Sequence, residues 1–265
     1  QVAAIARGQH LDAIRRGGLT LMSGDQCFHA AIEATDKPAE LGVQDLVVVT
    51  VKATALPEVA VSIKPLVGPD TRVLFTQNGM QWWYPLGLDH PRPVPDIPVF
   101  ALRSAFLAHM RPGQVLGSIL YTANEVKAPG TVINTSPSHN RIYIAAALPE
   151  GPDPADVRQV FHHAGITALE VPDIRERLWK KLLFNMSSSA LALVTGNMSS
   201  VTRSDPELPE TFTRLVGEGL AIAQAWGHAL HDDMDPAQML TLLLDHKPSI
   251  LQDYERGRRM EVAEI

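Results

Sequence analysis

The feature that most constrains the fold is a set of short, continuously apolar, β-branched segments in the first half of the chain. The three clearest are VAAIA (2–6), DLVVVTVK (45–52) and RVLFTQ (72–77). Continuous rather than alternating apolar runs are typical of strands that a parallel sheet buries on both faces. A helix-length segment ending at a Gly-Pro turn joins the second run to the third, so this pair predicts one right-handed βαβ unit.

The pattern then changes twice along the chain. Residues 97–150 are rich in strand-type segments, of which RIYIAAAL (141–148) is the clearest, and they predict an antiparallel continuation of the sheet. After Pro172 no comparable strand pattern occurs until the last few residues. Helices are predicted there instead, at 175–193, 206–230 and 235–247, of which the last two are amphipathic.

The chain is therefore predicted to divide into an α/β domain, residues 1–171, and an all-α domain, residues 172–265. The cleft between two such domains is the usual place for a cofactor and a substrate.

Composition excludes several functional classes. With 45% hydrophobic and 20% charged residues, the 265-residue chain is typical of a globular protein. A net charge of −6, with no basic run longer than RGRR (256–259), argues against a nucleic-acid partner. The single cysteine, Cys27, fits a cytoplasmic location, and no apolar run is long enough for a membrane span.

The predicted helix at 175–193 is apolar on most of its surface but carries one polar row. Lys181, Asn185, Ser188 and Ser189 fall within about a quarter of its circumference. Two interpretations remain open: the row faces solvent, or it lines a ligand cleft. In a cleft, the ammonium could donate a proton and the other side chains could hydrogen-bond an oxygen-rich ligand.

A second group of candidate residues lies near the end of the chain. Pro248 suits the first position of a helix, which leaves the N–H of Ser249 beside its own hydroxyl at a helix N-terminus. Such an end can bind a carboxylate. Gly257 is predicted to end this helix, and Glu261 follows in a short extended stretch, either as a site residue or as an ordinary surface carboxylate.

The third group follows the predicted parallel strands. Lys52 ends one of them and Asn78 directly follows another, at the carboxyl edge where open α/β sheets bind ligands. Asn-Gly can also mean only a turn. Arg7 ends the first predicted strand, and a carboxylate there would favour NAD. An arginine instead accommodates the 2′-phosphate of NADP.

Four blocks in this order, VTVKA, QNGM, LWKKLLFN and HKPSILQDYERGRRMEV, resemble the ketopantoate reductase (2-dehydropantoate 2-reductase) family over nearly the whole chain. The resemblance implies an N-terminal Rossmann-type α/β domain that binds NADPH and an all-α C-terminal domain for substrate binding and dimerisation, with a homodimer as one option. It also implies reduction of a small-molecule 2-keto acid to a 2-hydroxy acid, with 2-dehydropantoate as the first candidate in pantothenate biosynthesis.

The resemblance assigns roles residue by residue. Lys181 is implied as the catalytic residue. Substrate binding falls to Lys181, Asn185, Ser189, Ser249 and Asn78. Cofactor binding falls to Arg7, Lys52, Asn78, Ala123 and Glu261.

The chain departs from the family in two ways. The Gly-rich loop after the first family strand is absent, and we expect that strand and loop to precede Gln1 and a final helix to follow Glu261. Ser189 replaces the family's second Asn, which keeps two alternatives open: a related reductase of another keto acid, or a non-catalytic NADPH-binding sensor.

Overall fold

A five-stranded sheet contains the predicted βαβ unit. Its strand order is β11-β10-β7-β6-β5. The strands are β5 (Leu46–Val49), β6 (Arg72–Phe75), β7 (Val115–Tyr121), β10 (Arg141–Ala146) and β11 (Thr167–Leu169). Strands β5, β6 and β7 are parallel, and β10 pairs antiparallel with β7. The parallel pair and its antiparallel continuation are confirmed.

The crossover from β5 to β6 is helical but broken. It consists of a 3-10 turn (Ala53–Ala55), helix α2 (Leu56–Ser62) and a second 3-10 turn (Lys64–Leu66). The two prolines of this stretch, Pro57 and Pro65, both stand at the start of a helical turn, where a missing N–H costs nothing.

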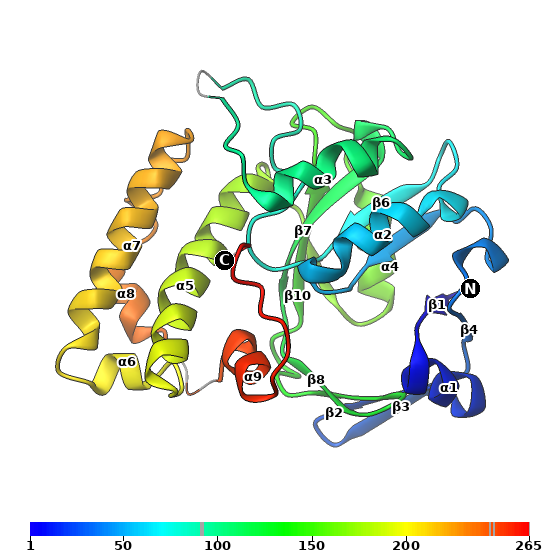
Figure 1. The fold of residues 1–265 in the computed structure, drawn as a ribbon, viewed down its shortest axis with the longest axis horizontal. Coiled ribbons are helices and arrows are strands. Elements are labelled where there is room, and N and C mark those ends of the chain that lie inside the picture. The colour runs from blue at the N-terminus through cyan, green and yellow to red at the C-terminus, as the bar shows by residue number, and fades with distance from the viewer. Residues whose placement is uncertain (91–92, 244, 246, 265) are drawn as a thin grey trace. The chain divides into compact units, whose positions relative to one another are not determined.

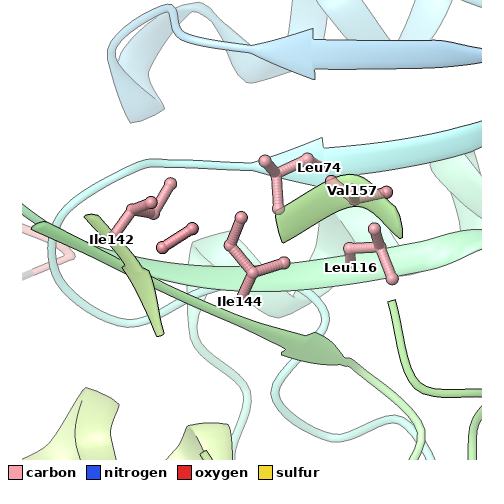
Figure 2. Close-up of a cluster of buried hydrophobic side chains, with 6 residues drawn as sticks. Leu74, Leu116, Ile142, Ile144 and Val157 are labelled. Atoms are coloured by element: carbon pink, nitrogen blue, oxygen red, sulfur yellow. The ribbon is translucent and has the colours of Figure 1, made fainter. Parts of the chain in front are cut away.

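The core of this sheet is an aliphatic cluster drawn in Figure 2. Its buried members are Leu74, Leu116, Ile142, Ile144, Val157 and Ala168. Val157 comes from helix α4 (Ala155–His163), which covers this part of the sheet. Burial on both faces was predicted for all three apolar runs, but only β6 fits fully. Val48 of β5 is 37% exposed, because β5 is an edge strand.

Two further sheets lie outside the five-stranded one. Strands β1 (Ala3–Ile5) and β4 (Glu33–Thr35) pair in parallel beside helix α1 (Gly8–Gly17), whose Leu11 and Ile14 pack on Ala34. A four-stranded sheet has the order β3-β2-β9-β8 and was not predicted as such. Its strands are β2 (Leu19–Ser23), β3 (Gln26–Ala30), β8 (Asn124–Ala128) and β9 (Thr131–Asn134).

One helix in the first half was not predicted. The stretch 97–150 is strand-rich, as expected, since it holds β7 to β10, but α3 (Pro98–Leu107) opens it as a helix. Its Val99 and Phe106 are buried, and its sequence, PVFALRSAFL, is nearly all apolar. Such a run cannot be assigned to helix or strand by periodicity.

The described residues after Pro172 form helices and irregular segments; helices were predicted here, but those expected at 206–230 and 235–247 already end at Ala225 and Thr241. The helices are α5 (Ile174–Thr195), α6 (Val201–Ser204), α7 (Leu208–Ala225), α8 (Pro236–Thr241) and α9 (Ser249–Glu255). Figure 1 shows α5, the longest, with α7 and α9 beside it. The glycines at 217 and 219 lie inside α7, so they form no phosphate-binding loop.

The computed structural model describes residues 1–90, 93–243, 245 and 247–264. These residues group into two compact units. The first holds Gln1–Val49, Glu58–Thr76 and Ala105–Pro172, and the second holds Thr50–Pro57, Gln77–Ser104 and Asp173–Ile265. The second unit therefore contains, besides the helices, the segments that directly follow β5 and β6. No helix among the described residues is long and apolar enough to cross a membrane.

The aliphatic cluster gives a direct test of the sheet core. Ile144 is fully buried, so Ile144→Ala should lower the free energy of unfolding by about 2–5 kcal/mol through lost burial and a residual cavity. Val126 of β8 is 61% exposed, and Val126→Ala should change it by less than about 0.5 kcal/mol. Urea unfolding of both variants measures the contrast, and equal losses would contradict this description of the core.

Candidate active site

Helix α5 carries the polar row and has well-defined ends. The side chain of Asp173 caps its start by accepting from the N–H of Arg175 at 2.8 Å, and Glu176 lies in its first turn. Gly196, with φ of 68°, ends the helix in the left-handed conformation that glycine adopts without strain. These signals fix which residues of α5 face its neighbours.

Lys181 of α5 contacts the loop that follows β6. Its Nζ donates to Oδ1 of Asn78 at 2.6 Å, although 103 residues separate the two. Burial of the ammonium lowers the pKa of Lys181 to about 8. The residue keeps some exposure, but its charged end is desolvated, so the solvent-facing interpretation of the polar row does not hold for Lys181.

The remaining members of the row differ in their surroundings. Asn185, one turn after Lys181, is half-buried. Ser188 is buried and its hydroxyl donates to the carbonyl of Phe184 at 2.7 Å, which is a helix-internal bond. Ser189 is 7% exposed, so the row passes from half-buried to buried along the helix.

The loop that carries Asn78 is anchored to the start of α5. The buried guanidinium of Arg175 donates to the carbonyl oxygens of Tyr84 at 2.8 Å and Leu86 at 2.5 Å. Trp179 donates its indole N–H to the Tyr84 hydroxyl at 2.8 Å, and His228 lies 3.2 Å from the same hydroxyl. Burial lowers the pKa of Arg175 and raises the pKa of Tyr84. Helix α5 thus holds this loop at three points.

The aromatic residues of this loop belong to the core. Trp82 and Trp83 are fully buried, and the Arg175 guanidinium lies 5.9 Å from the Trp83 ring centroid. Because both tryptophans are enclosed by protein, their role is to fix the loop.

The C-terminal segment lies against the loops that follow β5 and β6. Oε1 of Glu261 accepts from the N–H of Ala53 at 2.7 Å, and the carbonyl of Glu264 accepts from the N–H of Met80 at 2.6 Å. Glu261 is 7% exposed and lies in irregular backbone, so it is neither an ordinary surface carboxylate nor part of an extended strand. Burial and the nearby Glu261 raise the pKa of Glu264.

Lys52 forms an ion pair that the sequence did not indicate. Its Nζ contacts Oδ2 of Asp253, whose side chain is 2% exposed, and Arg258 Nη2 lies 2.9 Å from the other oxygen, Oδ1. Asp253 stands four residues after Ser249 on α9, on the same face of the helix. No local feature of the sequence marks Asp253 as a partner of Lys52.

The surroundings of three other predicted residues are as follows. Ser249 is the exposed first residue of α9, with Pro248 just before the helix instead of inside it. Arg7, in the first unit, is exposed and pairs with Glu58 at 2.5 Å. Ala123 links β7 to β8, and its N–H donates to the Ser136 hydroxyl at 2.7 Å.

Known proteins match both halves of the chain. Residues 1–147 match the family model described as ketopantoate reductase PanE/ApbA, and residues 173–265 match its C-terminal counterpart. The chain belongs to the ketopantoate reductase family. The resemblance seen in the sequence is confirmed, and with it the predicted fold class, a Rossmann-type α/β domain followed by a helical one.

Ketopantoate reductases from several organisms are similar over almost all of this chain. A 2-dehydropantoate 2-reductase from Mesorhizobium japonicum is 31% identical over 98% of this chain and 80% of its own length. The structure of a provisionally named ketopantoate reductase from Ralstonia solanacearum MolK2 superimposes with a TM-score of 0.86 at 27% identity, over 98% of this chain and 79% of that one.

A third likeness shows the fold alone. D-mandelate dehydrogenase, solved with NADH and anilino(oxo)acetate, superimposes with a TM-score of 0.82 at 16% identity, over 98% of this chain and 80% of that one. This chain therefore shares its fold with D-mandelate dehydrogenase.

The close approach of the C-terminal segment to Gly79 can be tested by substitution. A Cβ at Gly79, where φ is 77°, would lie 2.1 Å from the carbonyl oxygen of Glu264. Gly79→Ala should therefore displace the C-terminal segment and make it sensitive to limited proteolysis. Gly257→Ala is the control, because Gly257 also has a positive φ but no atom lies within 4 Å of the added carbon. Equal sensitivity of the two variants would contradict the proposed contact.

Proposed function

We propose that this chain reduces a 2-keto acid to a 2-hydroxy acid with NADPH, with 2-dehydropantoate, which would yield pantoate, as the first candidate substrate. The observation that carries the proposal is the desolvated ammonium of Lys181, hydrogen-bonded to Asn78 on the loop after β6. A proton donor whose pKa lies near neutrality suits general acid catalysis, and about 8 is close to that range.

Lys181 would act on the carbonyl oxygen of the keto acid. Negative charge develops on that oxygen as its carbon accepts hydride, and a fixed cation stabilises it most at that moment. Lys181 would donate one proton to the oxygen, leaving a neutral amine and a hydroxyl group, and would then regain a proton from solvent. Asn78 would hold the ammonium in the required direction, since its Oδ1 accepts one of the three N–H bonds.

Side chains near Lys181 would bind the rest of the substrate. Asn185 and Ser189 follow it by one and two turns on α5, and each offers hydrogen-bonding groups. We assign them to the polar groups of the keto acid, and Ser249 to its carboxylate. The Ser249 hydroxyl and the first N–H groups of α9, which no side chain caps, are donors of the kind that such an anion needs.

The chemistry of several donors fits a phosphorylated nicotinamide cofactor. Lys52 and Arg7 are part-exposed cations, of the type that binds phosphate oxygens, and each comes soon after a strand. We assign Lys52 to the phosphates, Arg7 to the 2′-phosphate, and Asn78, Ala123 and Glu261 to the rest of the cofactor. When bound, the cofactor supplies the hydride.

A reductase of another keto acid remains the main alternative. Ser189 is shorter than the Asn that the family has there, which leaves room for a larger acyl group. The shared fold of D-mandelate dehydrogenase, solved with a compound that carries an anilino group, favours including aromatic keto acids in a substrate panel. Steady NADPH consumption with any member of the panel would separate an enzyme from a non-catalytic NADPH sensor.

We place the proposed activity in the reducing cytoplasm. Its pathway would be the biosynthesis of pantothenate. The single cysteine supports this setting, because an exposed thiol with no partner in the same chain persists where thiols are kept reduced. The helical half would form the subunit contact if the enzyme works as a homodimer.

Replacing Lys181 tests the proposed proton donor. Lys181→Ala should lower kcat by about 10²- to 10⁴-fold, the usual range for a lost general acid, while NADPH still binds. Lys180→Ala is the matched control. Burial lowers the pKa of Lys180, but its hydrogen bonds to Asp233 and Glu176 outweigh that effect and raise it, and both carboxylates are part-exposed. The two variants remove the same charge from the same turn of α5, so Lys180→Ala should keep nearly full kcat. Full turnover by Lys181→Ala would contradict the proposed mechanism.

Replacing Arg7 tests the cofactor preference. Arg7→Ala should weaken NADPH binding by about 1–3 kcal/mol, the scale of a lost charged hydrogen bond, and leave NADH nearly unaffected. Arg16→Ala, at an exposed position in the last turn of α1, controls for net charge. Isothermal titration with both cofactors gives the comparison, and equal losses for NADPH and NADH would rule out a contact to the 2′-phosphate.

A further inference from the structure

We propose that Asp253 is a positioning residue that holds the ammonium of Lys52 in place to bind a cofactor phosphate. This inference rests on the proposed function, because it assumes that Lys52 meets a phosphorylated cofactor. It adds a residue that none of the assigned roles includes.

The surroundings of Asp253 are unusual for a carboxylate. Its side chain is 2% exposed, although aspartates are rarely buried unless they are paired. The burial is compensated by Lys52, 201 residues away in the chain, which donates to Oδ2. Arg258 adds an ionic contact to Oδ1, but within the described ranges no hydrogen bond reaches that oxygen. The strong, directed bond of Asp253 is therefore the one to Lys52.

A second carboxylate holds the next residue of the same loop. Glu261 accepts from the N–H of Ala53 at 2.7 Å, and Ala53 directly follows Lys52. The two carboxylates belong to one continuous stretch of chain. Within it, the N–H of Arg258 donates to the Asp253 carbonyl at 2.8 Å, which forms a turn at the end of α9. The C-terminal stretch thus holds two consecutive residues after β5, one by its side chain and one by its backbone.

Asp253 and the two cations that contact it carry a net positive charge, whereas the Glu261 carboxylate is bound to the Ala53 N–H. One buried carboxylate lies between Lys52 and Arg258, whose side chains are 43% and 49% exposed, so the three charges sum to plus one. An exposed cation that is held at one end by a buried anion keeps free N–H bonds for a second anion. A phosphate oxygen matches such a site in charge and geometry.

Two effects of Asp253 on anion binding oppose each other. As a counter-charge it weakens the attraction of the site for phosphate, so its removal would strengthen binding. As a support it fixes a side chain with four rotatable bonds, so its removal would weaken binding. Solvent screens the first effect, because both cations are half-exposed, whereas the second acts through direct contact. We therefore expect the positioning effect to prevail.

The test is NADPH affinity and steady-state kinetics of the Asp253→Asn variant of the full-length protein. Asparagine keeps the shape of the aspartate side chain but removes its charge. The dissociation constant for NADPH should therefore rise by about 10-fold, the effect of one weakened charged hydrogen bond. The value of kcat should change by less than about twofold, because the proton donor is untouched. Glu255→Gln is the control, since Glu255 lies on the same helix and pairs with Lys247 at the surface.

A double-mutant cycle distinguishes positioning from a general structural effect. Lys52→Ala should weaken NADPH binding by a similar factor, and Asp253→Asn should have no further effect once Lys52 is gone. Tighter or unchanged binding by Asp253→Asn, or an equal loss with and without Lys52, would overturn the inference. If Asp253→Asn does not fold, unchanged NADPH affinity in Lys52→Ala overturns it instead.

The same data separate this inference from the proposed function. Wild-type protein that fails to bind NADPH and to reduce any keto acid would refute the proposed function itself. Wild-type protein that binds NADPH and turns over, beside an Asp253→Asn variant that is indistinguishable from it, would refute only the role of Asp253.

Discussion

The hydrogen bond between the Lys181 ammonium and the Asn78 amide oxygen is the interaction on which the account of this protein depends. A desolvated ammonium is costly unless a polar group meets it, so the loop after β6 must be held in place. Arg175 and Trp179, from the preceding turns of α5, supply that constraint through Tyr84 and Leu86. One helix thus provides the reactive group and fixes the loop that orients it.

The end of the chain imposes a second constraint on the loops after the parallel strands. Its contacts are made by Asp253 and Glu261 with Lys52 and Ala53, and by the backbone of Glu264 with Met80. These residues lie about 200 positions apart in the sequence, yet all belong to one compact unit. The fold therefore places residues from the loops after β5 and β6, from α5 and from the end of the chain within that unit.

The fold was predictable where local pattern determines structure. The parallel pair β5 and β6 and the long helices were recognised from apolar runs and helical periodicity, which depend on residues close in sequence. Helix α3 was missed because an apolar run fits both helix and strand, and the edge strand β3 because Gln26–Ala30 is exposed throughout and shows no alternation.

The candidate site was predictable in part, for the same physical reason. Lys181 could be identified from a helix face and Asn78 from the end of a strand. Their hydrogen bond, however, is a property of the tertiary structure. Asp253 carries no local signal of its burial, since nothing in the sequence of α9 distinguishes it from a surface aspartate. The enclosure of Trp82 and Trp83 likewise depends on packing that the sequence does not display.

An NMR titration of the Lys181 ammonium in the wild-type protein tests directly whether this group can act as the proton donor. Its signals would be followed with isotopically labelled lysine and assigned by their loss in Lys181→Arg. Because burial favours the neutral amine, the pKa should lie at about 8, and the ammonium should lose its proton well below the pH at which exposed lysines do. A midpoint at the ordinary lysine value of 10.5 would show that the group is solvated and would contradict the role proposed for it.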